Sequence, residues 1–219
     1  MTILGIMAKW PRPGEVKTRL AAVTSPQWAA DLAYACLQDT LERLAVVEAR
    51  RVVVFAPRSA QDDFARLAAD RFELWPQADG DLGQRMQAWF ATCLSNGAQR
   101  SVLLGADSPS LPLDFVRSAF TRLLQHDVVL GPATDGGYYL IGCAGRVPPI
   151  FEGIVWSTSS VLAETVAKIQ HAGLSLALLP PWYDVDTLDD CQMLRGHLTA
   201  QRLAGMDHGA SHVEALLNQ

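Results

Sequence analysis

The feature that most constrains this chain is a short apolar run that ends in a glycine and a carboxylate. Residues 102–104 (Val-Leu-Leu) precede Gly105, and Asp107 is the first charged residue after them. Such a run, bounded by turn residues, is typical of a strand buried on both faces of a sheet. In open α/β sheets, ligands bind beyond the carboxyl ends of these strands. The sequence therefore places Asp107 at a candidate binding edge, where it could hold a metal ion, orient a hydroxyl group or only cap the next helix.

Strand-like and helix-like segments alternate along most of the chain, which predicts a mostly parallel sheet covered on both faces. The expected strands are 2–8, 51–56, 72–75, 102–105, 127–131, 138–142 and 174–179, and the expected helices begin at Ser25, Ser59, Gly80, Pro112, Ser157 or Thr158, and Thr187. The turn at 132–137 is too short for a crossover helix, so the strand after it should be antiparallel. We therefore predict a single three-layer α/β/α domain over residues 1–205 and a C-terminal tail over 206–219. His208 and His212 are expected to be surface residues of that tail.

Composition excludes several classes of protein. The formal net charge is −5 and the pI is about 5.5, which argues against a broad nucleic-acid-binding surface. No uncharged apolar stretch approaches the length of a membrane span, and no basic leader precedes the first strand, so we expect a cytoplasmic protein. The four cysteines are far apart in apolar segments, which is typical of buried free thiols: Cys36, Cys93, Cys143 and Cys191.

The loop after the first strand is rich in cations. Lys9, Arg12, Lys17 and Arg19 lie around Gly14, just before a short helix. Cations and free backbone N–H groups at a helix start are typical of a phosphate site, although a solvated basic loop would have the same composition. The spacing does not fit a P-loop, and the chain has no G-x-G-x-x-G motif, so P-loop NTPases and Rossmann dehydrogenases are disfavoured.

Two glycine-rich turns offer further candidates. Gly80-Asp81-Leu-Gly83, followed by Arg85, forms a helix entrance where a ligand could approach the backbone, or where Asp81 only caps the helix. Asp135-Gly136-Gly137 places a carboxylate beside two flexible residues, as a plain hairpin turn also would.

A last pair of carboxylates, Asp184 and Asp186, alternates along an extended segment and should therefore share one face. Two carboxylates on one face repel unless a cation lies between them, and magnesium would suit oxygen ligands. The alternative is that Asp186 only caps the following helix.

Taken in order, these stretches resemble the nucleotide-diphospho-sugar transferase superfamily, which has the glycosyltransferase-A fold. More narrowly, the chain resembles the bacterial DUF2064 family of uncharacterised glycosyltransferase-like proteins, some of which have been labelled as transferases for modified sugars. The match is carried by Lys9-x-Pro-x-Pro-Gly-x-Val-Lys-Thr-Arg-Leu, Gly80-Asp-Leu-Gly, Gly105-x-Asp-Ser-Pro, Asp135-Gly-Gly-Tyr-Tyr and Trp156-Ser-Thr.

The resemblance implies a role for each stretch. Nucleotide contacts would come from Lys9, Arg12, Gly14, Lys17, Arg19, Gly80, Asp81, Gly83 and Arg85. Asp107 and Asp186 would hold Mg²⁺ or Mn²⁺, with Asp184 undecided, and Asp107, Asp135 and Lys17 are the catalytic candidates. The acceptor side would be formed by Asp135, Gly136, Gly137, Tyr138, Trp156 and Ser157.

From this resemblance we expect a metal-dependent glycosyltransferase that uses a nucleotide-sugar donor and a small-molecule acceptor. One departure matters, because sugar-transferring members usually have Asp-x-Asp where this chain has Asp107-Ser-Pro. The alternatives are a nucleotidyltransferase that joins a nucleoside triphosphate to a phosphorylated acceptor and releases pyrophosphate, and a nucleotide-binding protein without catalysis. The base, the sugar, the acceptor and the oligomeric state do not follow from the sequence.

Overall fold

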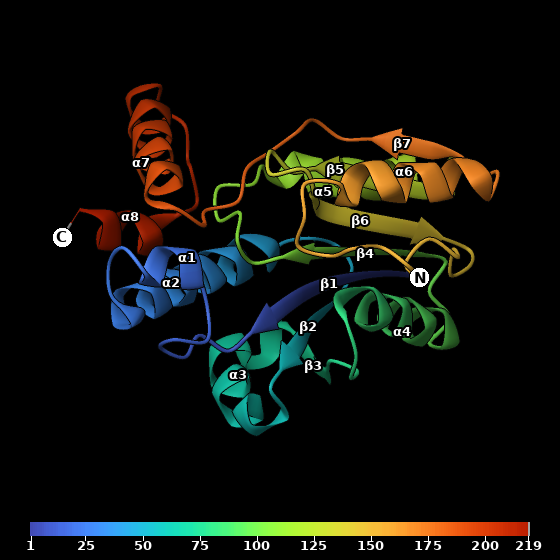
Figure 1. Cartoon of the computed structure of the whole chain (residues 1–219), viewed down its shortest axis with the longest axis horizontal. Coiled ribbons are helices and arrows are strands. Elements are labelled where there is room, and N and C mark those ends of the chain that lie inside the picture. The colour runs from blue at the N-terminus through green and yellow to red at the C-terminus, as the bar shows by residue number, and fades with distance from the viewer. Residues whose placement is uncertain (219) are drawn as a thin grey trace.

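The computed structural model describes residues 1–218, which form a seven-stranded sheet with helices on both faces (Figure 1). The strands are β1 (Thr2–Lys9), β2 (Arg50–Ala56), β3 (Glu73–Pro76), β4 (Arg100–Gly105), β5 (Val128–Pro132), β6 (Tyr138–Ala144) and β7 (Leu176–Leu178). The helices are α1 (Thr18–Ala21), α2 (Pro26–Leu44), α3 (Gln61–Ala68), α4 (Leu82–Ser95), α5 (Leu113–Arg122), α6 (Val161–His171), α7 (Leu188–Leu203) and α8 (Ser211–Leu217), with 3-10 turns η1 (Arg58–Ala60) and η2 (Ala69–Arg71).

The strand order is β3-β2-β1-β4-β6-β5-β7. All neighbouring strands pair in parallel except β6, which is antiparallel to both β4 and β5. The short turn between β5 and β6 leaves no room for a crossover helix, which is why β6 reverses. The predicted α/β class, with a mostly parallel sheet and one antiparallel strand, is therefore confirmed.

Side chains alternate between the two faces of the sheet. In β1, Leu4 and Ile6 face the side covered by α2, α3 and α5, whereas Ile3 faces the side covered by α4 and α6. All three residues are fully buried. This alternation, repeated in β2 and β4, explains why the central strands read as continuous apolar runs.

A third apolar cluster joins α1, α2, α7 and α8, which gather at one end of the molecule (left in Figure 1). Val213 of α8 is fully buried in it, beside Leu194 and Leu198 of α7. The weakly patterned segment after residue 205 thus includes a helix that packs on the rest of the chain.

Two expected helix starts are wrong. Ser59 caps nothing, because residues 58–60 form the turn η1 and α3 begins at Gln61 without a side-chain cap. Likewise α6 begins at Val161, after a loop that contains Ser157 and Thr158.

No helix within residues 1–218 combines the length and apolar character needed to cross a bilayer. All four cysteines are buried free thiols, as predicted.

Candidate active site

The site lies at the edge of the sheet where β1 and β4 end and β6 begins. The Val185 amide donates to the Asp107 carbonyl at 3.0 Å, which holds segment 184–186 against the end of β4. Trp182 is similarly held beside β5, because its amide donates to Pro132 at 3.0 Å. These backbone contacts bring carboxylates from distant parts of the sequence to one place.

Lys17 is the centre of that arrangement. Its Nζ donates to Asp107 Oδ1 at 2.6 Å, to the Val185 carbonyl at 2.7 Å and to Asp186 Oδ1 at 3.3 Å. The Lys17 side chain is only 3% exposed, whereas those of Asp107 and Asp186 are 53% and 37% exposed. We call these three oxygens, from Asp107, Val185 and Asp186, the oxygen cage.

Burial alone would lower the pKa of the Lys17 ammonium, but attraction to Asp107 and, more weakly, Asp186 raises the pKa above its ordinary value. Lys17 is therefore charged at neutral pH. Its backbone has φ 43° and ψ 50°, in the left-handed region that non-glycine residues rarely adopt. Strain of this kind is characteristic of functional sites.

Neither Asp107 nor Asp186 caps a helix. Helix α5 has Pro112 at its N-cap position, and α7 is capped by Thr187, which forms a capping box with Asp190. The structural alternatives that the sequence left open for the two carboxylates are thus wrong.

Asp184 and Asp186 have different hydrogen-bond partners, because Asp186 accepts from Lys17 and Asp184 does not. Asp184 accepts a hydrogen bond from Ser108 and lines a different cavity. Burial raises the pKa of Asp184 to about 6, the Ser108 hydrogen bond opposes the rise, and the charges of Asp107 and Asp186 add to it. That Asp184 and Asp186 share one acidic face, and that Asp184 joins a metal site, therefore stay predictions.

Two cavities meet at Asp107. The smaller, of about 170 Å³, is bordered by Lys9, Lys17 and Asp186. The larger, of about 250 Å³, has mainly apolar walls and includes Asp184 and Tyr138. The oxygen cage thus lines a cavity that has two lysines and two aspartates in its wall, whereas the larger cavity is mostly apolar.

The basic loop does not act as a single group of cations. Lys9 pairs with Glu15 at 3.2 Å, and Arg12 donates to Ser59 Oγ at 3.2 Å. Arg19 is exposed on α1, and Gly14 is exposed with φ 80°. Within the described residues 1–218, Lys17 is the one member of these four cations that contacts Asp107 and Asp186.

The second glycine-rich stretch is organised by local contacts. Asp81 caps α4 and forms a capping box with Gln84, which is the structural alternative considered for it. Arg85 donates to the Gly80 carbonyl at 2.8 Å and to Gln77 Oε1 at 3.1 Å, so it braces the loop before α4. A Cβ on Gly83 would lie 2.5 Å from the Phe151 carbonyl, so α4 can approach that segment only with glycine there.

The third stretch forms a tight turn before β6. Asp135 Oδ1 accepts from the Gly137 amide at 2.9 Å, as in an ordinary Asx turn. Gly136 has φ 93°, and a Cβ there would lie 2.3 Å from the Ser159 carbonyl. Asp135 is exposed, and its carboxylate lines neither cavity.

The remaining acceptor-side candidates separate. Tyr138 lines the larger cavity, whereas Trp156 packs beside Gly83 and Ser157 is exposed with φ 63°. Sequence reasoning missed Leu82 and Met86, which line that cavity from the first turns of α4. Two apolar residues in an otherwise polar, glycine-rich stretch could have indicated that they line a cavity.

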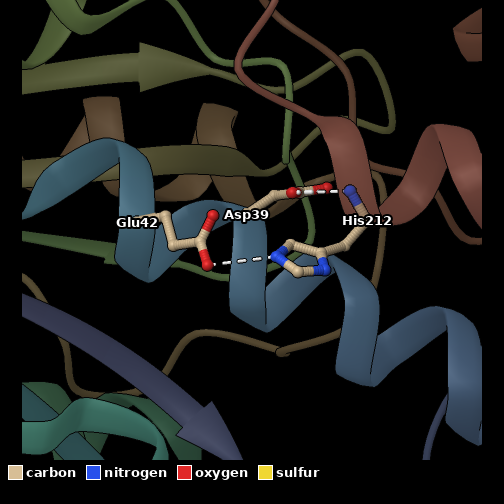
Figure 2. Close-up of side chains that lie close together, drawn as sticks. All are labelled: Asp39, Glu42 and His212. Carbon is tan, nitrogen blue, oxygen red and sulfur yellow. Dashed lines mark hydrogen bonds and ion pairs between the residues drawn. The ribbon is translucent and has the colours of Figure 1, made fainter.

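Figure 2 shows a second cluster, where Asp39 and Glu42 on α2 face His212 on α8. The carboxylate oxygens and imidazole nitrogen that could ligate a metal ion lie within 4.8 Å of one another. However, Asp39 accepts from the amides of His212 (3.0 Å) and Val213 (2.9 Å), while Glu42 pairs with the His212 ring at 3.0 Å. These contacts cap and dock α8, so His212, with 36% of its side chain exposed, is a surface residue that also holds α8 in place.

The fold and the cluster of Lys17, Asp107 and Asp186 define a protein of the nucleotide-diphospho-sugar transferase superfamily. Comparison with known proteins agrees with this class. The chain belongs to the DUF2064 family, described as uncharacterized proteins conserved in bacteria, whose model matches residues 40–158.

Three relatives illustrate the likeness. A crystal structure from Desulfovibrio desulfuricans G20, provisionally described as a nucleotide-diphospho-sugar transferase, is 32% identical, covers 100% of this chain and 97% of its own, and has a TM-score of 0.89. A 3-phospho-D-glycerate guanylyltransferase of Phenylobacterium zucineum (strain HLK1) is 36% identical over 141 residues, which are 60% of this chain and 62% of the relative. A cytidylyltransferase from Leptospira borgpetersenii serovar Hardjo-bovis (strain JB197) shares the fold at 15% identity, with a TM-score of 0.60 over 99% of this chain and 94% of its own.

Proposed function

We propose that this protein is a nucleotidyltransferase that joins a nucleoside triphosphate to a phosphorylated small-molecule acceptor and releases pyrophosphate. The observation that carries the proposal is the cluster in which Lys17 contacts Asp107 and Asp186 beside a basic loop. The guanylyltransferase relative supports this reading over the glycosyl transfer expected from the sequence. The chain spans 62% of that relative's length, so the shared activity is part of the proposal.

Charge distribution supports the same chemistry. In nucleotidyl transfer an oxygen of the acceptor phosphate attacks the α-phosphorus, the bond to the β-phosphate oxygen breaks, and its electron pair leaves with pyrophosphate. Stabilising that anion requires positive charge near the outer phosphates. Lys9 and Lys17 line the smaller cavity and would supply it, and Arg12 and Arg19 add positive charge to the same segment of the chain.

The oxygen cage fits a divalent ion by its chemistry. Two carboxylates and a backbone carbonyl are hard oxygen donors, and they already surround one cation, the Lys17 ammonium. Asp107 and Asp186 would hold Mg²⁺ or Mn²⁺. When bound, such an ion neutralises phosphate charge and makes the α-phosphorus easier to attack.

Each of the two cavities would bind a different part of the reactants. The phosphates would lie toward the basic loop, where Lys17 and the backbone N–H groups at the start of α1 can bind them. The acceptor would enter the larger cavity, where Tyr138, Leu82 and Met86 exclude water from the reacting groups. The relative's name makes GTP and 3-phospho-D-glycerate the first pair to test.

The test is pyrophosphate release from a nucleoside triphosphate with magnesium, measured with and without phosphorylated acceptors. We expect release to depend on the acceptor and to fall at least a hundredfold in Asp107→Asn. Asp114→Asn is the matched control, because that carboxylate is 87% exposed on α5 and pairs only locally with Arg117. Release of a nucleoside diphosphate from a nucleotide sugar, with triphosphates inert, would instead establish glycosyl transfer.

A further inference from the structure

Lys17 occupies the place that the divalent ion would need. Its ammonium lies within hydrogen-bond distance of all three oxygens of the oxygen cage, at 2.6, 2.7 and 3.3 Å. An ammonium and a divalent ion cannot share these donors, because they would repel at short range and compete for the same lone pairs. The free protein therefore carries its own cation at this position.

The surroundings allow Lys17 to leave. The smaller cavity, about 170 Å³, is bordered by Lys17 itself as well as by Lys9, Val16 and both carboxylates. The lysine side chain has four rotatable bonds, so Nζ can move several ångströms without a change of fold. A phosphate group in that cavity would offer the ammonium oxygens to replace those it gives up.

The backbone fixes where the side chain starts. Lys17 has φ 43° and lies immediately before α1, and its side chain is buried, with only 3% exposed. Lys9, by contrast, has a 48% exposed side chain and pairs with Glu15 inside its own loop. Of these two lysines, only Lys17 contacts the oxygen cage.

We propose that Lys17 is an internal competitor for the divalent ion, so that the metal binds together with the nucleotide and only weakly to the free protein. This inference rests on the metal site named under the proposed function. Nucleotide phosphates draw the ammonium out of the oxygen cage, and the freed carboxylates then accept the ion. Lys17 thereby couples two binding events and keeps its positive charge for the phosphates.

The experiment measures Mn²⁺ binding without nucleotide, by the electron paramagnetic resonance signal of free Mn²⁺. Lys17→Met removes the ammonium and keeps a side chain of similar length. We expect it to bind Mn²⁺ at least tenfold more tightly than the wild type. Lys17→Gln should show the same gain, and it serves as the second test if methionine is not accommodated.

Lys9→Met is the matched control, because it removes one positive charge from the same loop without touching the oxygen cage. We expect its Mn²⁺ affinity to stay within about twofold of the wild type, since exposed charges are screened. Equal gains in Lys9→Met and Lys17→Met would overturn the inference, because only bulk charge would then matter. So would unchanged or weaker Mn²⁺ binding in both Lys17 variants.

The outcome is independent of the reaction class. Tighter Mn²⁺ binding in Lys17→Met would support the competition even if the product assay identified a glycosyltransferase. Conversely, pyrophosphate release with no gain in Mn²⁺ binding would leave the proposed function standing and remove the competition.

Discussion

Replacing Asp107 with asparagine tests whether the cluster holds the site together as described. The substitution keeps the shape of the side chain and removes its charge, which leaves the buried Lys17 ammonium with Asp186 and the Val185 carbonyl. Removing one partner of a fully buried ion pair costs about 3–5 kcal/mol. Because the Asp107 side chain is 53% exposed and Lys17 keeps two partners, we expect a smaller loss, about 1–2 kcal/mol.

The loss is measurable by urea denaturation and by melting temperature. For a chain of this size, about 1–2 kcal/mol corresponds to a decrease of roughly 2–8 °C in Tm. The control Asp114→Asn should change the free energy of unfolding by less than about 0.5 kcal/mol. The double variant Lys17→Met with Asp107→Asn should show a coupling energy of about 1 kcal/mol or more. Additive effects, or an Asp107→Asn protein as stable as the wild type, would refute the contact.

Two further substitutions test the supports of the site and of the C-terminal helix. Gly136→Ala should destabilise by about 1 kcal/mol more than Gly145→Ala, because both have positive φ but only Gly136 faces a backbone contact; equal losses in urea denaturation would contradict this. Asp39→Ala should cost about 1–3 kcal/mol and speed hydrogen exchange at the His212 and Val213 amides, which it leaves without their acceptor. Unchanged exchange there would mean that α8 is held by its apolar contacts alone.

The sheet was predictable because its central strands carry a local signal. The run 102–104 and its glycine place Asp107 at the carboxyl edge of β4, and the short turn before Tyr138 dictates the reversed strand. Thr187 and Asp190 form a capping box four residues long, so the start of α7 was also visible locally. The same kind of pattern misled at Ser59, because there the chain forms a 3-10 turn instead.

The pairings of the site could not be predicted from local patterns. Lys17 is 90 residues from Asp107 and 169 from Asp186 in the sequence, and only the folded sheet brings them together. Alternation predicts a shared face for Asp184 and Asp186, but it could not indicate that Ser108 donates a hydrogen bond to Asp184. The candidate residues of the site could be identified from the sequence, whereas the contacts between them depend on tertiary packing.

The central claim is that nucleotidyl groups, and not sugars, are transferred, and the position of a phosphorus label tests it most directly. The protein would be incubated with magnesium, a phosphorylated acceptor and a nucleoside triphosphate labelled at the α-phosphorus. We predict that the label appears in a new acceptor–nucleotide product, in amounts equal to the unlabelled pyrophosphate released. If the label stays in the unreacted triphosphate while a nucleotide sugar offered in parallel yields nucleoside diphosphate, the account is contradicted.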